Sequence, residues 1–179
     1  PGKIGKMKVK NRIVLPPCTT NFAGPTGEAS NRLIKYYAER ARGGVGLIII
    51  ENTQVKYPEG KNVSCQLRLD DDKYIPSYQE LAEAIQVYGA KVFQQIHHAG
   101  RQVHNTEGVT PVAPSAIPCG FLQIPVRELT SEEVWDLVER FSETALRVKK
   151  AEMDGVEFHG AHGYLIGQFM SPHTNQRID

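Results

Sequence analysis

The chain has 179 residues, of which 40% are hydrophobic and 23% are charged, and its formal net charge is +1. This balance is typical of a globular chain with enough apolar material for one core, and it excludes a strongly basic or acidic domain whose charge alone would indicate a partner. Three widely spaced cysteines without a C-x-x-C pair argue against a disulfide framework or thiolate metal cluster and favour a reducing, cytoplasmic location: Cys18, Cys65 and Cys119.

The N-terminal arm, residues 1 to about 11, is basic. Its lysines have no interleaved aromatic residues, so we expect a solvated edge and no nucleic-acid partner. Residues 12–16 have the character of a first strand. The residues that follow, Pro16 to Thr20, contain no glycine, whereas a doubly wound dinucleotide-binding sheet places a glycine-rich phosphate turn after its first strand.

Three predicted helices alternate with three further strands. Apolar residues recur at helical spacing after Ser30, from Ile75 to Tyr88, and after a T-x-x-E capping box formed by Thr130 and Glu133. The strands are predicted at residues 45–51, 91–96 and 155–159. The apolar run in the first of these is far shorter than the roughly 20 residues that cross a bilayer, so we expect no membrane partner.

Regular alternation of strand and helix favours parallel strands joined by right-handed crossovers, in either a doubly wound sheet or a (β/α) barrel. The absence of a glycine turn favours the (β/α) TIM barrel. A whole barrel needs roughly 250 residues, so four strands correspond to the N-terminal half of one, and residues 1–179 to part of a single domain. The proline-rich segment from about 97 to 129 is much longer than a usual connection and is predicted to be a lid.

Candidate functional residues follow the end of each predicted strand. Because the carboxyl ends of parallel barrel strands meet at one mouth, we expect these residues to lie together. They are Pro17, Cys18 and Thr19; Glu51, Asn52 and Thr53; Gln94, Gln95, His97 and His98; and His159, His162 and Tyr164. The last set is the most informative, because two imidazoles and a phenol fall within six residues.

Several of these residues also have a purely structural interpretation. His159 and His162 can be hydrogen-bonded polar residues at a strand end, and Tyr164 can begin an apolar helix. Gln94 and Gln95 differ, because a buried amide must be hydrogen-bonded. At least one of these two glutamines is therefore predicted to face a polar ligand.

Five motifs occur in order along essentially the whole chain: Asn11–Pro17 (NRIVLPP), Gly46–Glu51 (GLIIIE), Gln95–Arg101 (QIHHAGR), Ala113–Ser115 (APS), and His159–Leu165 (HGAHGYL) with Ser171-Pro172 and Asn175–Asp179. Together they resemble the old yellow enzyme family. The resemblance is nearest to its bacterial branch of NADH:flavin oxidoreductases, enoate reductases and 2,4-dienoyl-CoA reductases. The shared order of the motifs makes it specific.

The resemblance implies an FMN-dependent reductase on a (β/α) barrel, in which hydride passes from NADH or NADPH to the flavin and then to the β-carbon of a small-molecule alkene. By position, His159 and His162 match the pair that hydrogen-bonds the substrate carbonyl oxygen, and Tyr164 matches the proton donor to the α-carbon. Donors fixed on that oxygen would stabilise the developing charge, and a phenol with a pKa of about 10 stays protonated at neutral pH.

Cofactor-binding positions carry over in the same way. Gln95 matches the amide that pairs with the flavin pyrimidine edge, and Asn52 matches a residue whose backbone touches the ring. Pro17, Cys18 and Thr19 match the loop beneath the isoalloxazine ring. Thr19 occupies the place where some relatives carry a redox-tuning cysteine, so that role is not assigned to Cys18. No resident metal is implied.

The resemblance also implies that part of the flavin site lies outside these 179 residues. In the family, loops from the last barrel strands hold the flavin phosphate. We therefore expect an isolated chain of residues 1–179 to bind FMN weakly or not at all and to have little reductase activity. We also expect it to associate with itself or with the missing half of the barrel, because its edge strands are unpaired.

Two alternatives stay open from the sequence. In a metal-dependent hydrolase barrel, neutral imidazoles from neighbouring strand ends would gather around zinc, and the candidates are His97, His98, His159 and His162. In a non-catalytic half-barrel, the same fold would only assemble, with itself or with a complementary half, through a large apolar interface, and it would need no ligand.

Overall fold

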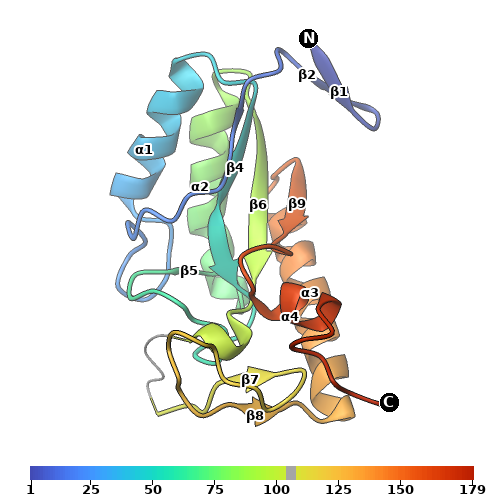
Figure 1. The fold of residues 1–179 in the computed structure, drawn as a ribbon. Helices are drawn as coiled ribbons and strands as arrows, with labels where there is room; N and C mark the ends of the chain where they lie inside the picture. The colour runs from blue at the N-terminus through green and yellow to red at the C-terminus, as the bar shows by residue number, and fades with distance from the viewer. Residues whose placement is uncertain (104–107) are drawn as a thin grey trace.

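A parallel sheet organises the molecule in a computed structural model that describes residues 1–103 and 108–179 (Figure 1). Its strands pair in the order β3 (Val14–Leu15), β4 (Leu47–Gln54), β6 (Lys91–His97) and β9 (Gly155–Phe158), and the short β5 (Leu67–Arg68) pairs with the end of β4. The four main strands lie where the sequence predicts them. The strand order is that of a (β/α) barrel, which confirms the predicted fold class.

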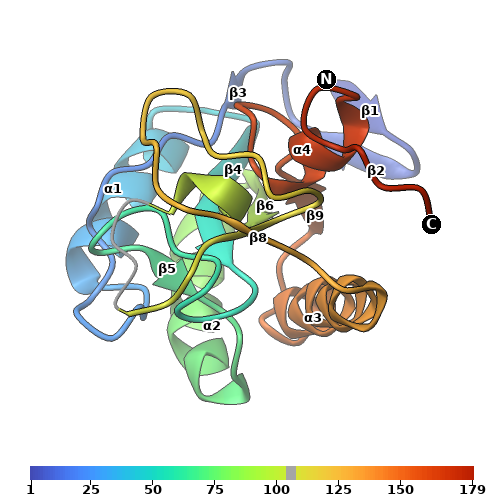
Figure 2. The ribbon, with the colours of Figure 1, turned by 60° about the horizontal axis from the view of Figure 1, so that its bottom comes forward.

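Three helices lie around the outside of these strands, as Figure 2 shows. They are α1 (Asn31–Arg42), α2 (Ile75–Gln86) and α3 (Ser131–Lys150), and the shorter helices are η1 (Asp72–Tyr74), η2 (Gly100–Gln102) and α4 (Leu165–Met170). α1 begins where the Ser30 hydroxyl accepts a hydrogen bond from the N–H of Leu33. α3 begins with the predicted capping box of Thr130 and Glu133.

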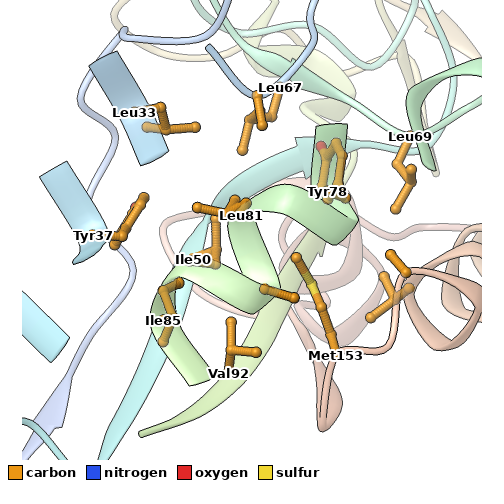
Figure 3. Packing of buried hydrophobic residues seen from close by; sticks show 14 of the residues in the cluster. Leu33, Tyr37, Ile50, Leu67, Leu69, Tyr78, Leu81, Ile85, Val92 and Met153 are labelled. Atoms are coloured by element: carbon orange, nitrogen blue, oxygen red, sulfur yellow. The ribbon is translucent and has the colours of Figure 1, made fainter. Parts of the chain in front are cut away.

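The main core lies between the helices and the outer face of the sheet (Figure 3). It contains fully buried side chains from α1, α2 and the strands, including Leu33, Tyr37, Tyr78, Leu81, Ile85, Ile50 and Val92. Burial of this apolar surface is the main force that holds the helices on the sheet. Because side chains alternate along a strand, the residues between these core positions face the barrel interior.

The inner face of the sheet is apolar at its amino end. Leu47 and Ile49 of β4 and Phe93 of β6 form a small cluster with β2 (Met7–Val9). β2 pairs antiparallel with β1 (Gly2–Ile4), so the N-terminal arm is a hairpin that packs against this end of the sheet. Its lysines are exposed, as predicted, but the sequence analysis did not predict the hairpin.

The proline-rich segment predicted as a lid contains secondary structure that the sequence did not reveal. β7 (Val112–Ala113) and β8 (Arg127–Glu128) pair in parallel within it. The Arg101 guanidinium donates to the carbonyl oxygens of Ile117 and Pro118, each at 3.2 Å. Residues 104–107, which also belong to the predicted lid, lie outside the described residues. The lid function stays a prediction.

An apolar groove of about 570 Å³ lies between α3, β9 and α4. Val138 on α3 is 51% exposed, and Phe158 on β9, an edge strand of the sheet, is 56% exposed. Exposed apolar side chains gathered in one groove make it a candidate interaction surface. Within the described ranges, no helix combines the length and the apolar character needed to span a membrane.

We predict that an isolated chain of residues 1–179 associates through this groove. Val138→Glu introduces a charge into the apolar lining and should shift the species seen in sedimentation velocity toward monomer. The matched control is Val87→Glu, because Val87 is 75% exposed beside the end of α2 and does not line the groove. A monomeric unchanged chain, or equal effects of the two substitutions, would contradict the prediction.

Candidate active site

β4 contains a bulge at the place where the predicted site begins. Its pairing with β6 is regular up to Ile50 and resumes at Thr53, so that Glu51 and Asn52 together oppose Gln95. A bulge bends a strand and redirects its side chains, and bulges are common beside active sites. The predicted cofactor-binding residues Asn52 and Gln95 are therefore directly across from each other at this irregularity.

Side chains replace the ladder hydrogen bonds that the bulge removes. The Glu51 N–H donates to the Tyr37 hydroxyl at 2.9 Å, and the Gln94 amide donates to the Glu51 carbonyl at 2.7 Å. Gln94 thus binds backbone, whereas Gln95 alternates to the inner face, where its amide donates to Glu157 Oε1 at 2.8 Å. Gln95 therefore shares the inner face with His97, and its role toward a ligand stays a prediction.

His159 and His162 form a short hydrogen-bonded chain. The Ala161 N–H donates to His159 Nδ1 at 3.3 Å, so the proton of the neutral His159 ring lies on Nε2. That Nε2 lies 3.4 Å from His162 Nδ1, which then accepts. The exposed His162 consequently keeps an Nε2–H that is available to a ligand.

The backbone that carries these histidines is strained and is held by two buried glutamines. His162 has a φ of 58° and Gly163 a φ of 70°, and the left-handed region costs a non-glycine residue about 1 kcal/mol. The Gln102 amide donates to the carbonyls of His162 and Gly163 at 2.8 and 2.6 Å, and Gln168 donates to the Gly163 carbonyl at 2.7 Å. These bonds hold His162 in its unusual conformation.

The Tyr164 hydroxyl belongs to a network that reaches the bulge. The Asn62 amide donates to the Tyr164 oxygen at 2.9 Å, which leaves the phenolic hydrogen free to be donated elsewhere. The Asn62 N–H donates to Gln66 Oε1 at 2.9 Å, and Gln66 Nε2 donates to Asn52 Oδ1 at 3.2 Å. Tyr164 and Asn52, predicted from separate motifs, therefore share one set of side chains.

His97 completes the polar cluster. Its ring centroid lies 4.5 Å from that of Tyr164, nearly perpendicular to it, and 5.3 Å from that of His159. Burial lowers the pKa of His97 well below its usual value of 6.5, so the ring is neutral. Neither ring nitrogen has a hydrogen-bond partner in the described part of the chain. Buried polar atoms are seldom left unpaired, so these nitrogens indicate where a bound molecule or water completes the site.

The predicted loop of Pro17, Cys18 and Thr19 follows β3 at the same edge of the sheet, with Cys18 and Thr19 exposed. None of the three makes a hydrogen bond to the histidines or to Tyr164 among the described contacts. The loop is fixed instead through its next residue, Thr20, whose N–H and hydroxyl donate to the Glu51 carboxylate at 3.1 and 2.6 Å.

Of the four histidines in the zinc alternative, His97, His159 and His162 lie close together, but His98 does not join them. His98 Nδ1 accepts from the Gly100 N–H at 3.1 Å, and its Nε2 faces Glu59 Oε1 at 3.7 Å, so this ring is engaged elsewhere. In residues 1–103 and 108–179, no three or more His, Cys, Asp or Glu side chains are grouped to hold a metal ion. The three cysteines are free thiols.

Sequence reasoning missed three supporting residues of this site: Asn62, Gln102 and Gln168. Each is an amide in a loop or short helix with at least one partner distant in the sequence, namely Tyr164 for Asn62, His162 for Gln102 and Ala99 for Gln168, so no local spacing marks it. The QIHHAGR motif gave an indirect signal, because Gln102 directly follows it.

Comparison with known sequences supports the resemblance of the motifs. The sequence model of the NADH:flavin oxidoreductase / NADH oxidase family matches residues 1–179. An NADH oxidase of Thermoanaerobacter brockii is 61% identical over 180 residues, covering 99% of this chain and 28% of that protein. An NADPH dehydrogenase of Clostridium acetobutylicum is 38% identical over 176 residues, covering 98% of this chain and 51% of that protein. The chain thus spans from about a quarter to half of the length of these relatives.

Solved structures give the same result. An old yellow enzyme homologue from Zymomonas mobilis is similar with a TM-score of 0.90 and 32% identity, over 100% of this chain and 52% of that one. A 2-naphthoyl-CoA reductase in complex with 2-naphthoyl-CoA is similar with a TM-score of 0.94 and 33% identity, over 100% of this chain and 29% of that one.

We predict that His159 stays neutral in the folded chain throughout the neutral pH range. Burial, and secondarily the charge of His162, lower the pKa of His159 to about 4 from its usual 6.5. On acidification, His159 therefore becomes protonated near pH 6.5 in the unfolded chain but only near pH 4 in the folded chain. Folding stability is consequently lost as the pH falls from about 6.5 toward 4. NMR titration of the His159 ring, assigned with His159→Gln, should show this low midpoint. A midpoint near 6.5 would contradict it.

Proposed function

Because this chain belongs to the NADH:flavin oxidoreductase / NADH oxidase family, we propose that it forms part of an FMN-dependent enzyme that uses NADH or NADPH to reduce an activated alkene. The observation that carries this proposal is the cluster of His159, His162 and Tyr164 at the carboxyl end of the sheet, in which His162 Nδ1 and the Tyr164 oxygen accept hydrogen bonds and so leave one polar hydrogen on each side chain for a ligand. The names of the relatives, NADH oxidase and NADPH dehydrogenase, support the reductant.

The residues at this edge fit the pyrimidine edge of a flavin, which offers both carbonyl acceptors and an N–H donor. The Gln95 amide lies on the inner face and can present a donor and an acceptor side by side. The two unpaired nitrogens of His97 add a further donor and acceptor nearby. When bound, FMN would supply two-electron chemistry, taking hydride from the nicotinamide and delivering it to the alkene.

The two histidines would hold the carbonyl oxygen of the substrate. The hydrogen bond from His159 Nε2 to His162 Nδ1 is long at 3.4 Å and therefore weak. A substrate carbonyl oxygen can replace His162 Nδ1 as the acceptor of the His159 proton at little cost in free energy. N–H donors on that oxygen stabilise the negative charge that develops there as the β-carbon is reduced. A neutral His159 suits an uncharged carbonyl better than a carboxylate, which proteins bind mainly through charged donors.

Tyr164 would then donate its hydroxyl proton to the α-carbon. Asn62 supports this role in two ways. Because its amide donates to the Tyr164 oxygen, the phenolic hydrogen stays available before the proton transfer. After the transfer, the same amide N–H stabilises the negative charge on the Tyr164 oxygen. The proposal for the substrate is thus a small molecule with a carbon–carbon double bond conjugated to a carbonyl group. The free thiols are compatible with the reducing, cytoplasmic location that we propose for the protein.

We predict that Tyr164→Phe in the full-length protein slows alkene reduction at least about a hundredfold while leaving flavin reduction by NAD(P)H within about twofold, because only the proton donor is lost. Stopped-flow measurement of the two half-reactions separates these effects. The matched control is Tyr88→Phe, since Tyr88 is 43% exposed at the far end of α2. Equal slowing of both half-reactions by Tyr164→Phe would show that Tyr164 has another role.

We also propose that residues 1–179 require further polypeptide to bind FMN tightly, because they span only 51% or less of the two relatives described above. The apolar groove beside β9 is the surface that this polypeptide, or a second copy of the chain, would cover. We predict that titration with FMN, followed by flavin fluorescence and solution mass together, detects weak or no binding to the isolated chain. Tight stoichiometric binding to a monomer would contradict this proposal.

A further inference from the structure

A buried carboxylate lies beside the bulge and has no part in the proposed reaction. Glu51 is 1% exposed. Its Oε2 accepts hydrogen bonds from the Thr20 N–H at 3.1 Å, the Thr20 hydroxyl at 2.6 Å and the Tyr37 hydroxyl at 3.3 Å. Desolvation of a carboxylate is expensive, and an apolar side chain would fill the same space without that cost. The arrangement therefore has a purpose other than filling the core.

The partner of this carboxylate is the loop of residues 16–20, which makes no other hydrogen bond to the sheet within residues 1–103 and 108–179. Pro16 and Pro17 have no N–H to donate, and in the described part of the chain no hydrogen bond holds residues 16–19 in place. β3 ends at Leu15, so Thr20 is the first residue after the strand that is anchored. Burial raises the pKa of the Glu51 carboxyl and the bonds from Thr20 counteract this shift, so the anchor favours the ionised carboxylate, to which a hydrogen bond is stronger than to a neutral group.

The same residue also fixes the backbone of the bulge. The N–H of Glu51 donates to the Tyr37 hydroxyl, and its carbonyl accepts from the Gln94 amide. The next residue is Asn52, whose backbone is expected to touch the flavin ring. The side chain of Glu51 thus holds the loop of residues 16–20, and its backbone, which directly precedes Asn52, is itself fixed by Tyr37 and Gln94.

We propose that Glu51 is a positioning residue for the flavin. Its carboxylate, acting through Thr20, holds the loop of residues 16–20 in a fixed position relative to the bulge at Asn52, so that both segments can contact the isoalloxazine ring at once. This inference rests on the proposed function. It adds that the carboxylate of Glu51 holds the loop after β3, while the backbone of the same residue holds the bulge of β4, so that one residue fixes both segments before the flavin binds.

The test uses the full-length protein, and its readouts are the dissociation constant for FMN and the midpoint of thermal unfolding. Thr20→Val removes the hydroxyl at constant shape and should raise the FMN dissociation constant about tenfold. Glu51→Gln, which removes the charge, should do the same, and the double variant should be no weaker than either single one because the two residues act as a unit. Thr20→Ser retains the hydroxyl and should stay within about twofold of the unchanged protein.

The matched control is Tyr78→Phe. Tyr78 is a buried tyrosine on α2, and its hydroxyl hydrogen-bonds at 2.7 Å to the hydroxyl of Thr53, which lies on β4 as Glu51 does. Removing the Tyr78 hydroxyl therefore removes a buried hydrogen bond to β4 that does not involve the loop of residues 16–20. This variant should lower thermal stability but leave the FMN dissociation constant within about twofold.

Equal effects of Thr20→Val and Tyr78→Phe on FMN affinity would overturn the inference and leave the proposed function intact. If Thr20→Val does not fold, Glu51→Gln compared with Tyr78→Phe decides in the same way. Failure of the unchanged full-length protein to bind FMN would instead overturn the proposed function and, with it, this inference.

Discussion

Parallel pairing of the four main strands is the constraint on which the rest of the structure depends. Because β3, β4, β6 and β9 all run in one direction, the residues that follow them are brought to a single edge, although they come from motifs more than 100 positions apart in the sequence. The inner face of the sheet is apolar at the amino end and polar at the carboxyl end. The change from apolar to polar side chains along the strands creates a polar site at the carboxyl end of the sheet, within an otherwise apolar interior.

Side-chain amides then adapt the regular sheet to the needs of the site. Gln94 satisfies the backbone of the bulge, and Gln102 and Gln168 satisfy the carbonyls around the strained His162. A buried amide can replace a backbone partner because it carries the same donor and acceptor groups as a peptide. The site therefore departs from ideal strand geometry at two positions without leaving those backbone groups unpaired, which reconciles a rigid scaffold with the unusual conformations that the chemistry requires.

Periodic patterns predicted the three long helices and the strands β4, β6 and β9, which are long enough to show a pattern, whereas the two-residue β3 was located by the apolar run before Pro16. The capping box at Thr130 and the three helices are where the sequence places them. The two-residue strands β5, β7 and β8 could not be predicted, since two residues have no period. In the site, His159 and Tyr164 are close in the sequence and were predicted, whereas Asn62 is 102 residues from its partner and only the folded chain brings it there.

The most direct test of this account is hydrogen–deuterium exchange of the full-length protein with and without FMN. If the carboxyl edge of the sheet is the flavin site, FMN should protect the segments that follow β3, β4, β6 and β9, including residues 16–22 and 159–164, and should leave the N-terminal hairpin at the opposite end unchanged. Protection confined to the amino end of the strands, or to the apolar groove beside α3, would place the ligand elsewhere and contradict the account.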